Sequence, residues 1–192
     1  MKNFILTAMA SLAVLASCNN NEDVTTATTD TTLNNTAGNT DVNTTTSMPL
    51  NLEDSSFVME AASGGLMEVQ GGQLAQQMGK HAAVKQYGAM MERDHQAANN
   101  ELKAIAGMRN LMLADTMMKK HRDHVETLKN TSAANFDKQY IDMMVKAHNE
   151  DIAKFERVAS TASDDQLKAF ATKTLPILKM HRDSAQAIKS RL

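Results

Sequence analysis

The apolar residues between about Asp54 and Leu192 recur at steps of three and four, and this spacing constrains the fold more than any other feature. It places apolar side chains along one face of an α-helix. The chain also has 15 Met, 2 Pro and no Trp, which is a helical composition rather than a β one. The long stretches with this period cover about residues 54–79, 82–106, 134–159 and 165–188.

Four long amphipathic helices predict an all-α fold, namely an antiparallel four-helix bundle. The middle connection, about residues 108–133, is long enough to cross the bundle and contains an extra short helix at about 116–128. Asp54 or Ser55 is expected to cap the first helix, and the segment 163–165 the last. Pro176 should kink or split the last helix, because it lacks an N–H and displaces the turn before it.

Residues 1–17 have the form of a bacterial export signal. A basic start is followed by an apolar run, Phe4 to Ala16, that is shorter than the roughly 20 residues of a membrane span. The run ends in Leu15-Ala16-Ser17-Cys18, which resembles the lipobox of bacterial lipoproteins. We therefore expect lipidation at Cys18 and a protein held by that lipid in the cell envelope, periplasmic or associated with the outer membrane. The alternative is an ordinary signal peptide with an unrelated Cys.

Residues 18–50 are rich in Thr, Asn and Asp and nearly lack apolar side chains. Such a segment cannot bury enough surface to offset its ordering entropy, so we expect a disordered tether that leads into a bundle at 51–192. The net charge of −2 gives no sign of nucleic-acid binding. The single Cys excludes an internal disulfide. The sequence identifies no protein partner.

Four polar residues interrupt the apolar stripes, one in each long helix. Buried ionisable groups are costly unless they are paired or bind a metal. Near the middle of their helices, such side chains converge on the axis of a bundle, which is how metal sites in bundles are built. Imidazole with carboxylate suits Zn, Fe, Mn or Cu. Two interpretations stay open: a metal-free buried polar network, or one transition-metal ion. The candidate ligands in the second case are Glu68, His95, His148 and His181.

Other polar residues near these four are interpreted separately. Asp94 and Asp151 are candidates to orient the histidines by accepting their outer N–H groups. Glu92 stands three residues before His95, a spacing used in di-iron bundles, but the chain has too few carboxylates for such a centre, so Glu92 is interpreted as a surface residue. His121 and His124 are also interpreted as surface residues.

Two local patterns bear on how the helices pack. Residues 87–95 (YGAMMERDH) are echoed by residues 140–148 (YIDMMVKAH), which favours two related helix pairs. Gly64-Gly65 and Gly71-Gly72 lie on the same face as Glu68. Because glycine costs roughly 1 kcal/mol in a helix interior, these positions indicate close approach of a neighbouring helix.

Taken together, several segments resemble the DUF4142 family; they are residues 57–69, 72–75, 91–95, 136–148 and 175–181. The resemblance implies a ferritin-like bundle in an exported bacterial protein, without an established biochemical activity. The recurring positions of the family fall on Glu68, Asp94, His95, His148, Pro176 and His181. This chain departs from the family at Ala147, where Asp is frequent, and at Glu92, where an apolar residue is usual.

Two functional hypotheses remain open. The first is a lipid-anchored envelope protein with a non-catalytic binding or structural role. The alternative is a transition-metal-binding protein, redox-active in one version, that uses the Glu and three His of the core. Geometry separates them, because ligands of one ion must converge within about 2.0–2.2 Å of a common point.

Overall fold

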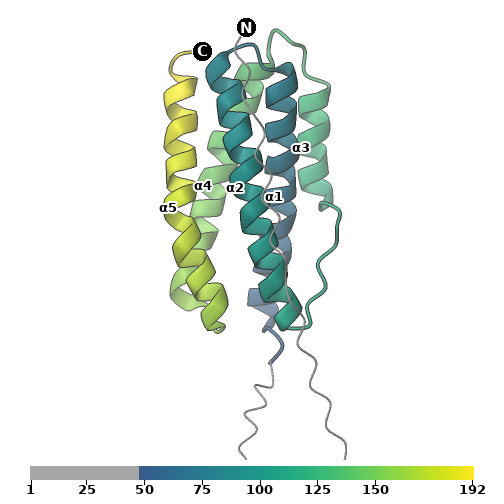
Figure 1. Ribbon diagram of the computed structural model, residues 1–192, viewed down its shortest axis with the longest axis vertical. Coiled ribbons are helices and arrows are strands. Elements are labelled where there is room, and N and C mark those ends of the chain that lie inside the picture. The colour runs from purple at the N-terminus through teal and green to yellow at the C-terminus, as the bar shows by residue number, and fades with distance from the viewer. Residues whose placement is uncertain (1–47) are drawn as a thin grey trace, which may run out of the picture. The chain divides into compact units, whose positions relative to one another are not determined.

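The computed structural model describes residues 48–192, which fold into five helices (Figure 1). The predicted signal, Cys18 and nearly all of the predicted tether lie outside this range. Within it, the all-α fold with four long helices and a short one in the middle connection is confirmed. The helices are α1 (Leu52–Met78), α2 (Ala82–Met108), α3 (Lys119–Lys129), α4 (Phe136–Thr161) and α5 (Asp165–Lys189).

The long helices form a bundle in which each runs antiparallel to its neighbours (Figure 1). The N–H groups of Lys80 and His81, just before α2, donate to Asp137 at the start of α4, so α2 and α4 begin at the same end. At the other end, Asn51 before α1 bonds to Ser163 before α5 at 3.0 Å. The connection that contains α3 therefore crosses the length of the bundle, as in ferritin-like folds.

Side-chain caps fix the starts of α1 and α5. Asn51 accepts a hydrogen bond from the N–H of Asp54 at 2.7 Å, so the expected cap at Asp54 or Ser55 is wrong by three or more residues. The carboxylate of Asp54 instead accepts from the N–H of Ser163, across the bundle end. Asp164 caps α5 within the predicted segment, accepting from the N–H of Leu167 at 2.9 Å.

The core consists of two apolar clusters, one toward each end of the bundle. Phe57, Phe155 and Phe170 belong to the cluster nearest the starts of α1 and α5. Tyr87 and Tyr140 belong to the other, where their rings meet edge to face with centroids 6.1 Å apart. In α2, α4 and α5 the predicted ligand position falls between the residues of these two clusters, and in α1 Glu68 directly follows Met67 of the second cluster. A polar layer thus interrupts the core near its middle.

Glycines bring the backbones of α1 and α2 together beside this layer. A Cβ added at Gly72 would lie 2.5 Å from the carbonyl oxygen of Gly88, and one at Gly88 would lie 2.6 Å from the oxygen of Gly72. At Gly65 a Cβ would overlap the side chain of Asn99. The predicted close approach is confirmed at Gly65 and Gly72, and Glu68 lies between them on the buried face.

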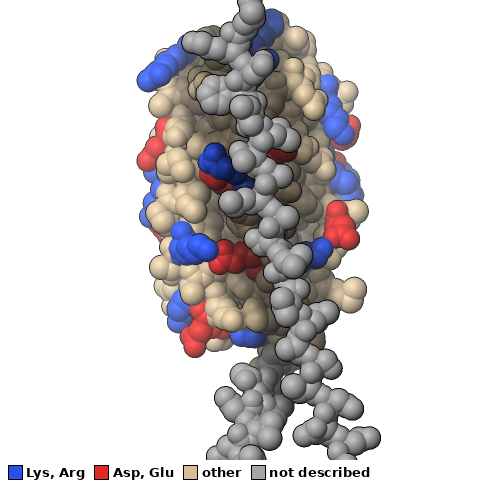
Figure 2. Space-filling model, viewed as in Figure 1, with Lys and Arg blue, Asp and Glu red and all other residues tan. Residues whose placement is uncertain are grey.

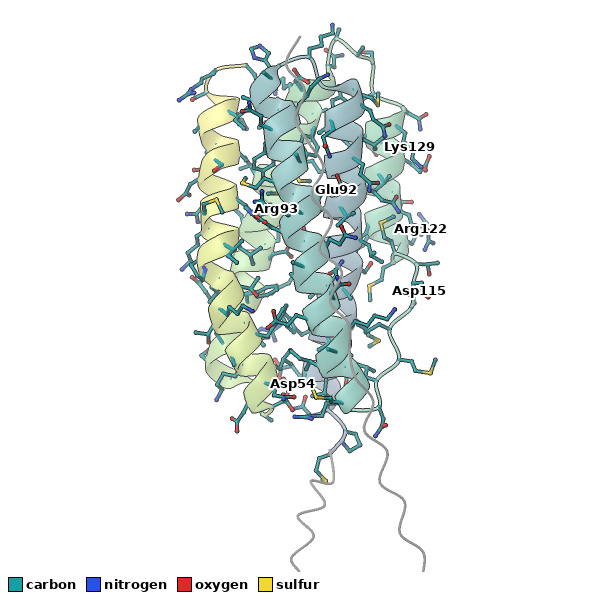
Figure 3. All side chains as sticks on the ribbon, viewed as in Figure 1. Asp54, Glu92, Arg93, Asp115, Arg122 and Lys129 are labelled. Atoms are coloured by element: carbon teal, nitrogen blue, oxygen red, sulfur yellow. The ribbon has the colours of Figure 1, made fainter. Side chains whose placement is uncertain are left out.

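Pro176 lies inside α5 without splitting it, since the helix is continuous from Asp165 to Lys189. None of the helices in residues 48–192 combines the length and apolarity that crossing a membrane requires. The face in Figure 2 carries basic and acidic side chains interspersed, without a large area of one sign. Figure 3 shows the side chains as sticks, with Glu92 on the side of α2 toward α1 and Arg93 on the side toward α5.

Candidate metal centre

The four predicted residues lie in one buried layer of the bundle. Glu68, His95, His148 and His181 are 2, 6, 0 and 1% exposed. One ring nitrogen of each histidine lies within 4.8 Å of one nitrogen from each of the other two. The centroids of the three rings are 5.3–5.5 Å apart. The side chains of α2, α4 and α5 therefore meet at a single level, which the metal hypothesis requires.

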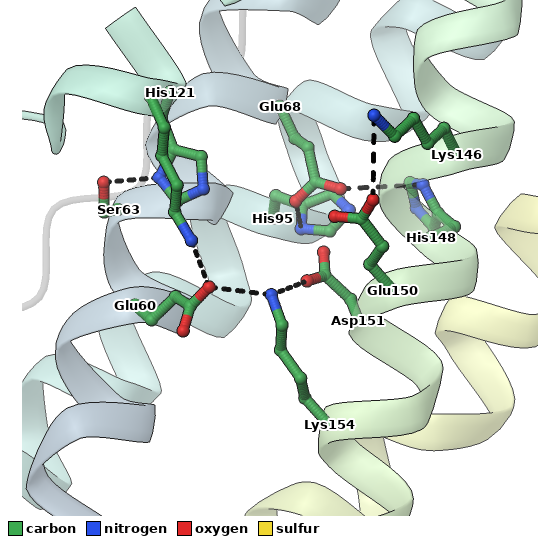
Figure 4. A network of polar contacts seen from close by, with 11 residues as sticks. Glu60, Ser63, Glu68, His95, His121, Lys146, His148, Glu150, Asp151 and Lys154 are labelled. Carbon is green, nitrogen blue, oxygen red and sulfur yellow. Dashed lines mark hydrogen bonds and ion pairs between the residues drawn. The ribbon is translucent and has the colours of Figure 1, made fainter.

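Each imidazole has one nitrogen close to an acceptor, and for His148 and His181 the contact is a hydrogen bond. Nδ1 of His148 donates to the carbonyl oxygen of Met144, one turn earlier in α4, at 2.9 Å. Nε2 of His181 donates to Oδ2 of Asp94 at 3.0 Å. Nδ1 of His95 lies 2.9 Å from Oε2 of Glu68 (Figure 4). The three rings are thus positioned by the carbonyl of Met144, the carboxylate of Asp94 and the carboxyl group of Glu68.

The other nitrogen of each ring is left for the inside of the cluster. Nε2 of His148 and Nδ1 of His181 face each other at 3.3 Å. Nε2 of His95 is buried and has no hydrogen-bond partner. Because a carbonyl can only accept, the proton of His148 resides on Nδ1 and its Nε2 presents a lone pair. Two nitrogens bound to one tetrahedral zinc ion at 2.0–2.1 Å are about 3.3–3.4 Å apart, which matches the observed separation.

Burial keeps the three imidazoles neutral. It lowers the pKa of His95, His148 and His181 from the ordinary 6.5 to about 4 in each case. Neutral imidazole is the form that binds metals, so no proton has to leave the rings at neutral pH.

The carboxyl groups around the cluster differ from one another. Burial raises the pKa of Glu68 to about 7, against the opposing influence of His148. Burial also raises the pKa of Asp151 to about 7. Asp94 behaves differently: burial alone would raise its pKa, but hydrogen bonds from Arg93 and His181 lower it. Asp94 is therefore the ionised acceptor of the site.

Glu68 lies on the outer side of the histidine rings. Its Oε2 contacts Nδ1 of His95, and its Oε1 lies 3.6 Å from Nδ1 of His148 (Figure 4). The ligand atoms that lie within 4.8 Å of one another belong to His95, His148 and His181, and this group does not include Glu68. The position of Glu68 suits an acceptor for imidazole N–H groups, and its predicted role as a metal ligand stays a prediction.

Asp94 and Asp151, the two candidates for orienting the histidines, occupy different positions. Asp94 contacts His181 directly, as described above. Asp151 has no hydrogen bond to a histidine among the described residues; it lies 3.4 Å from Nζ of Lys154, which also binds Glu60 at 2.8 Å (Figure 4). Asp151 therefore belongs to a charged chain at the edge of the layer.

His121 and Glu92 are both predicted to be surface residues, and the structure places them differently. His121 is 8% exposed and bonds through Nδ1 to the hydroxyl of Ser63 at 2.6 Å, so its placement on the surface is wrong. The signal that identifies it is the apolar face of α3, where His121, Val125 and Leu128 recur at helical spacing and pack inward. Glu92 is partly exposed and bonds to two glutamine side chains of α1, away from the histidines.

The fold and the layer together define a ferritin-like helical bundle with a buried cluster of three histidines. The sequence profile described as "Domain of unknown function (DUF4142)" matches residues 39–188. The chain therefore belongs to the DUF4142 family.

A search of solved structures finds a similar fold. The crystal structure of a DUF305 fragment from Deinococcus radiodurans superposes with a TM-score of 0.66 at 10% sequence identity. The match covers 75% of this chain and 99% of that one. At this identity the likeness concerns the fold alone. No curated protein matches the sequence.

Proposed function

We propose that this protein binds one transition-metal ion through His95, His148 and His181. One observation carries the proposal: Nε2 of His148 and Nδ1 of His181 face each other at 3.3 Å while both rings donate their other N–H elsewhere. Two lone pairs at this distance repel unless a cation lies between them. A metal ion satisfies both, and the unpartnered Nε2 of His95 supplies a third ligand.

The acceptors outside the rings support this reading. In metal sites a ligating histidine usually donates its second N–H to a carbonyl or carboxylate, which fixes the ring and increases its basicity. All three histidines have such an acceptor here, in Met144, Asp94 and Glu68. Three neutral imidazoles suit zinc, copper or iron better than manganese, which prefers oxygen ligands.

The competing arrangement is a metal-free network in which a proton takes the place of the ion. One ring of the His148–His181 pair would then be an imidazolium. Burial opposes this state, because it lowers the pKa of both rings to about 4. The metal-bound state needs no such charge on the protein, and we therefore favour it over the network.

We further propose that the bundle is lipid-anchored in the cell envelope through Cys18. The segment Leu15-Ala16-Ser17-Cys18 supports this, as does the signal-like run before it. Metabolic labelling with a clickable fatty acid tests the idea: the wild-type protein should be labelled and found with the membranes, and Cys18→Ser should be unlabelled and released. A labelled Cys18→Ser protein would contradict the anchor.

Metal content decides the main proposal. The full-length protein, extracted from membranes in detergent without chelator, should contain about one equivalent of a transition metal by mass spectrometry. His148→Ala and His181→Ala should each lose it, because two imidazoles hold an ion much less tightly than three. His121→Asn is the matched control, since it alters a buried histidine outside the cluster. Wild-type protein that neither contains nor takes up Zn, Cu or Fe would contradict the proposal.

A further inference from the structure

The proposed ion would leave part of its coordination free. Three protein ligands are the usual number in zinc sites that bind an exogenous molecule, whereas structural sites use four. Oε2 of Glu68 lies 2.9 Å from Nδ1 of His95, whereas the nitrogen of that ring without a partner is Nε2. What could occupy the remaining position depends on the space beside the rings.

A cavity between α2 and α5 reaches the histidine cluster from the surface. It has a volume of about 150 Å³, and its walls include Asp94, His95 and His181. Two of the three imidazoles thus border this cavity. Toward the outside the lining includes Glu101 and Lys173, which form an ion pair at 2.8 Å.

A second, smaller cavity of about 30 Å³ lies deeper in the bundle. Glu68, His95 and Asp151 form its polar wall. That volume suffices for one or two water-sized groups. The two cavities share His95, Ala98, Thr174 and Leu178 in their lining, so they adjoin at the same ring.

The charge of the donor set favours an anion at this position. Three neutral imidazoles do not offset the charge of a divalent ion. Of the carboxyl groups that line the two cavities, Asp94 is bonded to Arg93, Asp151 to Lys154 and Glu101 to Lys173, and Glu68 contacts His95. The small volumes exclude large molecules from the space next to His95.

We propose that the centre binds a small inorganic anion of up to about three atoms, which enters between α2 and α5 and contacts the ion beside His95. The inference rests on the proposed function, because it requires the ion. It makes Ala98 a residue that determines access, since its side chain lines both cavities.

Azide is a suitable probe, with the full-length protein loaded with Co²⁺. The ligand-field spectrum of Co²⁺ changes when a ligand is added. In the wild type, azide should change the spectrum in a saturable manner. Ala98→Leu fills the shared wall and should weaken azide binding at least tenfold. Ala89→Leu, at an exposed position of the same helix, is the control and should bind azide as the wild type does.

A second variant protects the test against a folding defect in Ala98→Leu. Ile177→Trp lies at the outer cavity, is 37% exposed, and should also weaken azide binding while leaving Co²⁺ uptake at one equivalent. If Co²⁺ binds but azide leaves the spectrum unchanged, or if both variants bind azide like the wild type, the access route is wrong and metal binding stands. If no Co²⁺ binds, the access route and the metal site both fail.

Discussion

Nε2 of His148 and Nδ1 of His181 lie 3.3 Å apart across the interface of α4 and α5, and neither nitrogen has a proton to share in the tautomers that the surrounding acceptors impose. The relationship depends on Met144, whose carbonyl orients one ring, and on Asp94 of α2, which orients the other. Residues outside the cluster should therefore influence metal affinity, and they can be tested without removing a ligand.

Asp94→Asn should weaken metal binding by about 10–100-fold without abolishing it. The amide oxygen can still accept from Nε2 of His181, but the neutral group no longer increases the basicity of the ring. Asp183→Asn is the matched control, because Asp183 also follows an arginine with which it pairs, yet it is 62% exposed. A competition titration with a chromophoric chelator measures both. Equal affinities for the two variants would contradict the role of Asp94.

Gly72→Ala should destabilise the bundle by roughly 1–3 kcal/mol, because the added Cβ would lie 2.5 Å from the carbonyl oxygen of Gly88, and backbone cannot move aside cheaply. Gly107→Ala is the control, since nothing lies within 4 Å of its added Cβ, and it should stabilise α2 by up to about 1 kcal/mol. Urea unfolding followed by circular dichroism compares them. A Gly72→Ala protein as stable as the wild type would show that the helix contact is adjustable.

His121 should make the metal-free protein sensitive to acid. Burial, reinforced by nearby Lys120, lowers its pKa from 6.5 to about 4. Between pH 6.5 and 4 the unfolded chain therefore binds a proton that the folded chain does not, so stability falls as the pH falls through this window. His121→Asn, which can still accept from the hydroxyl of Ser63, should lose less stability between pH 7 and pH 5, by about 1–2 kcal/mol.

Both the wild type and His121→Asn should be measured with chelator present, so that both are metal-free. The three cluster histidines then contribute the same pH dependence to both proteins. The midpoint of urea unfolding at several pH values gives the result. Parallel curves for wild type and His121→Asn would mean that His121 takes up its proton equally in both states.

Asp164→Ala should cost roughly 2–3 kcal/mol of stability. It removes the cap of α5 at the N–H of Leu167 and the partner of Arg109, whose side chain is only 19% exposed. Asp165→Ala, one residue later and exposed in the first turn, should cost less than about 1 kcal/mol. Thermal unfolding of the two variants should separate them clearly. Similar losses would mean that the cap and the ion pair contribute little.

The sequence could predict the buried layer because its members replace apolar residues at core positions of different helices. His148, for example, stands between Met144 and Ile152 at helical spacing, so it has to face the core. The echo of residues 87–95 in 140–148 is also visible in space, where Tyr87 meets Tyr140 and the ring of His95 meets that of His148. The spacing of apolar residues alone therefore shows which side chains face the core, and side-chain rotamers are not needed for that prediction.

The pairing of polar groups could not be predicted in the same manner. That Asp94 accepts from His181 depends on which helix is next to α2, and helix order does not follow from periodicity. The burial of His121 could not be predicted because α3 is short and most of its residues are polar or charged, which hides a narrow buried face. The cap of α1 could not be predicted because Asp54, although suited to capping, accepts from the distant N–H of Ser163 instead.

The crossing connection divides the chain into two hairpins, α1–α2 and α4–α5, and each supplies half of the polar layer. The first hairpin contributes one imidazole and one carboxyl, and the second contributes two imidazoles. Neither hairpin alone holds a set that would retain an ion firmly. During synthesis the complete set comes into existence only after the second hairpin has left the ribosome and closed onto the first. An ion bound at that moment would link the two hairpins. The metal-bound protein should therefore unfold more slowly than the metal-free protein.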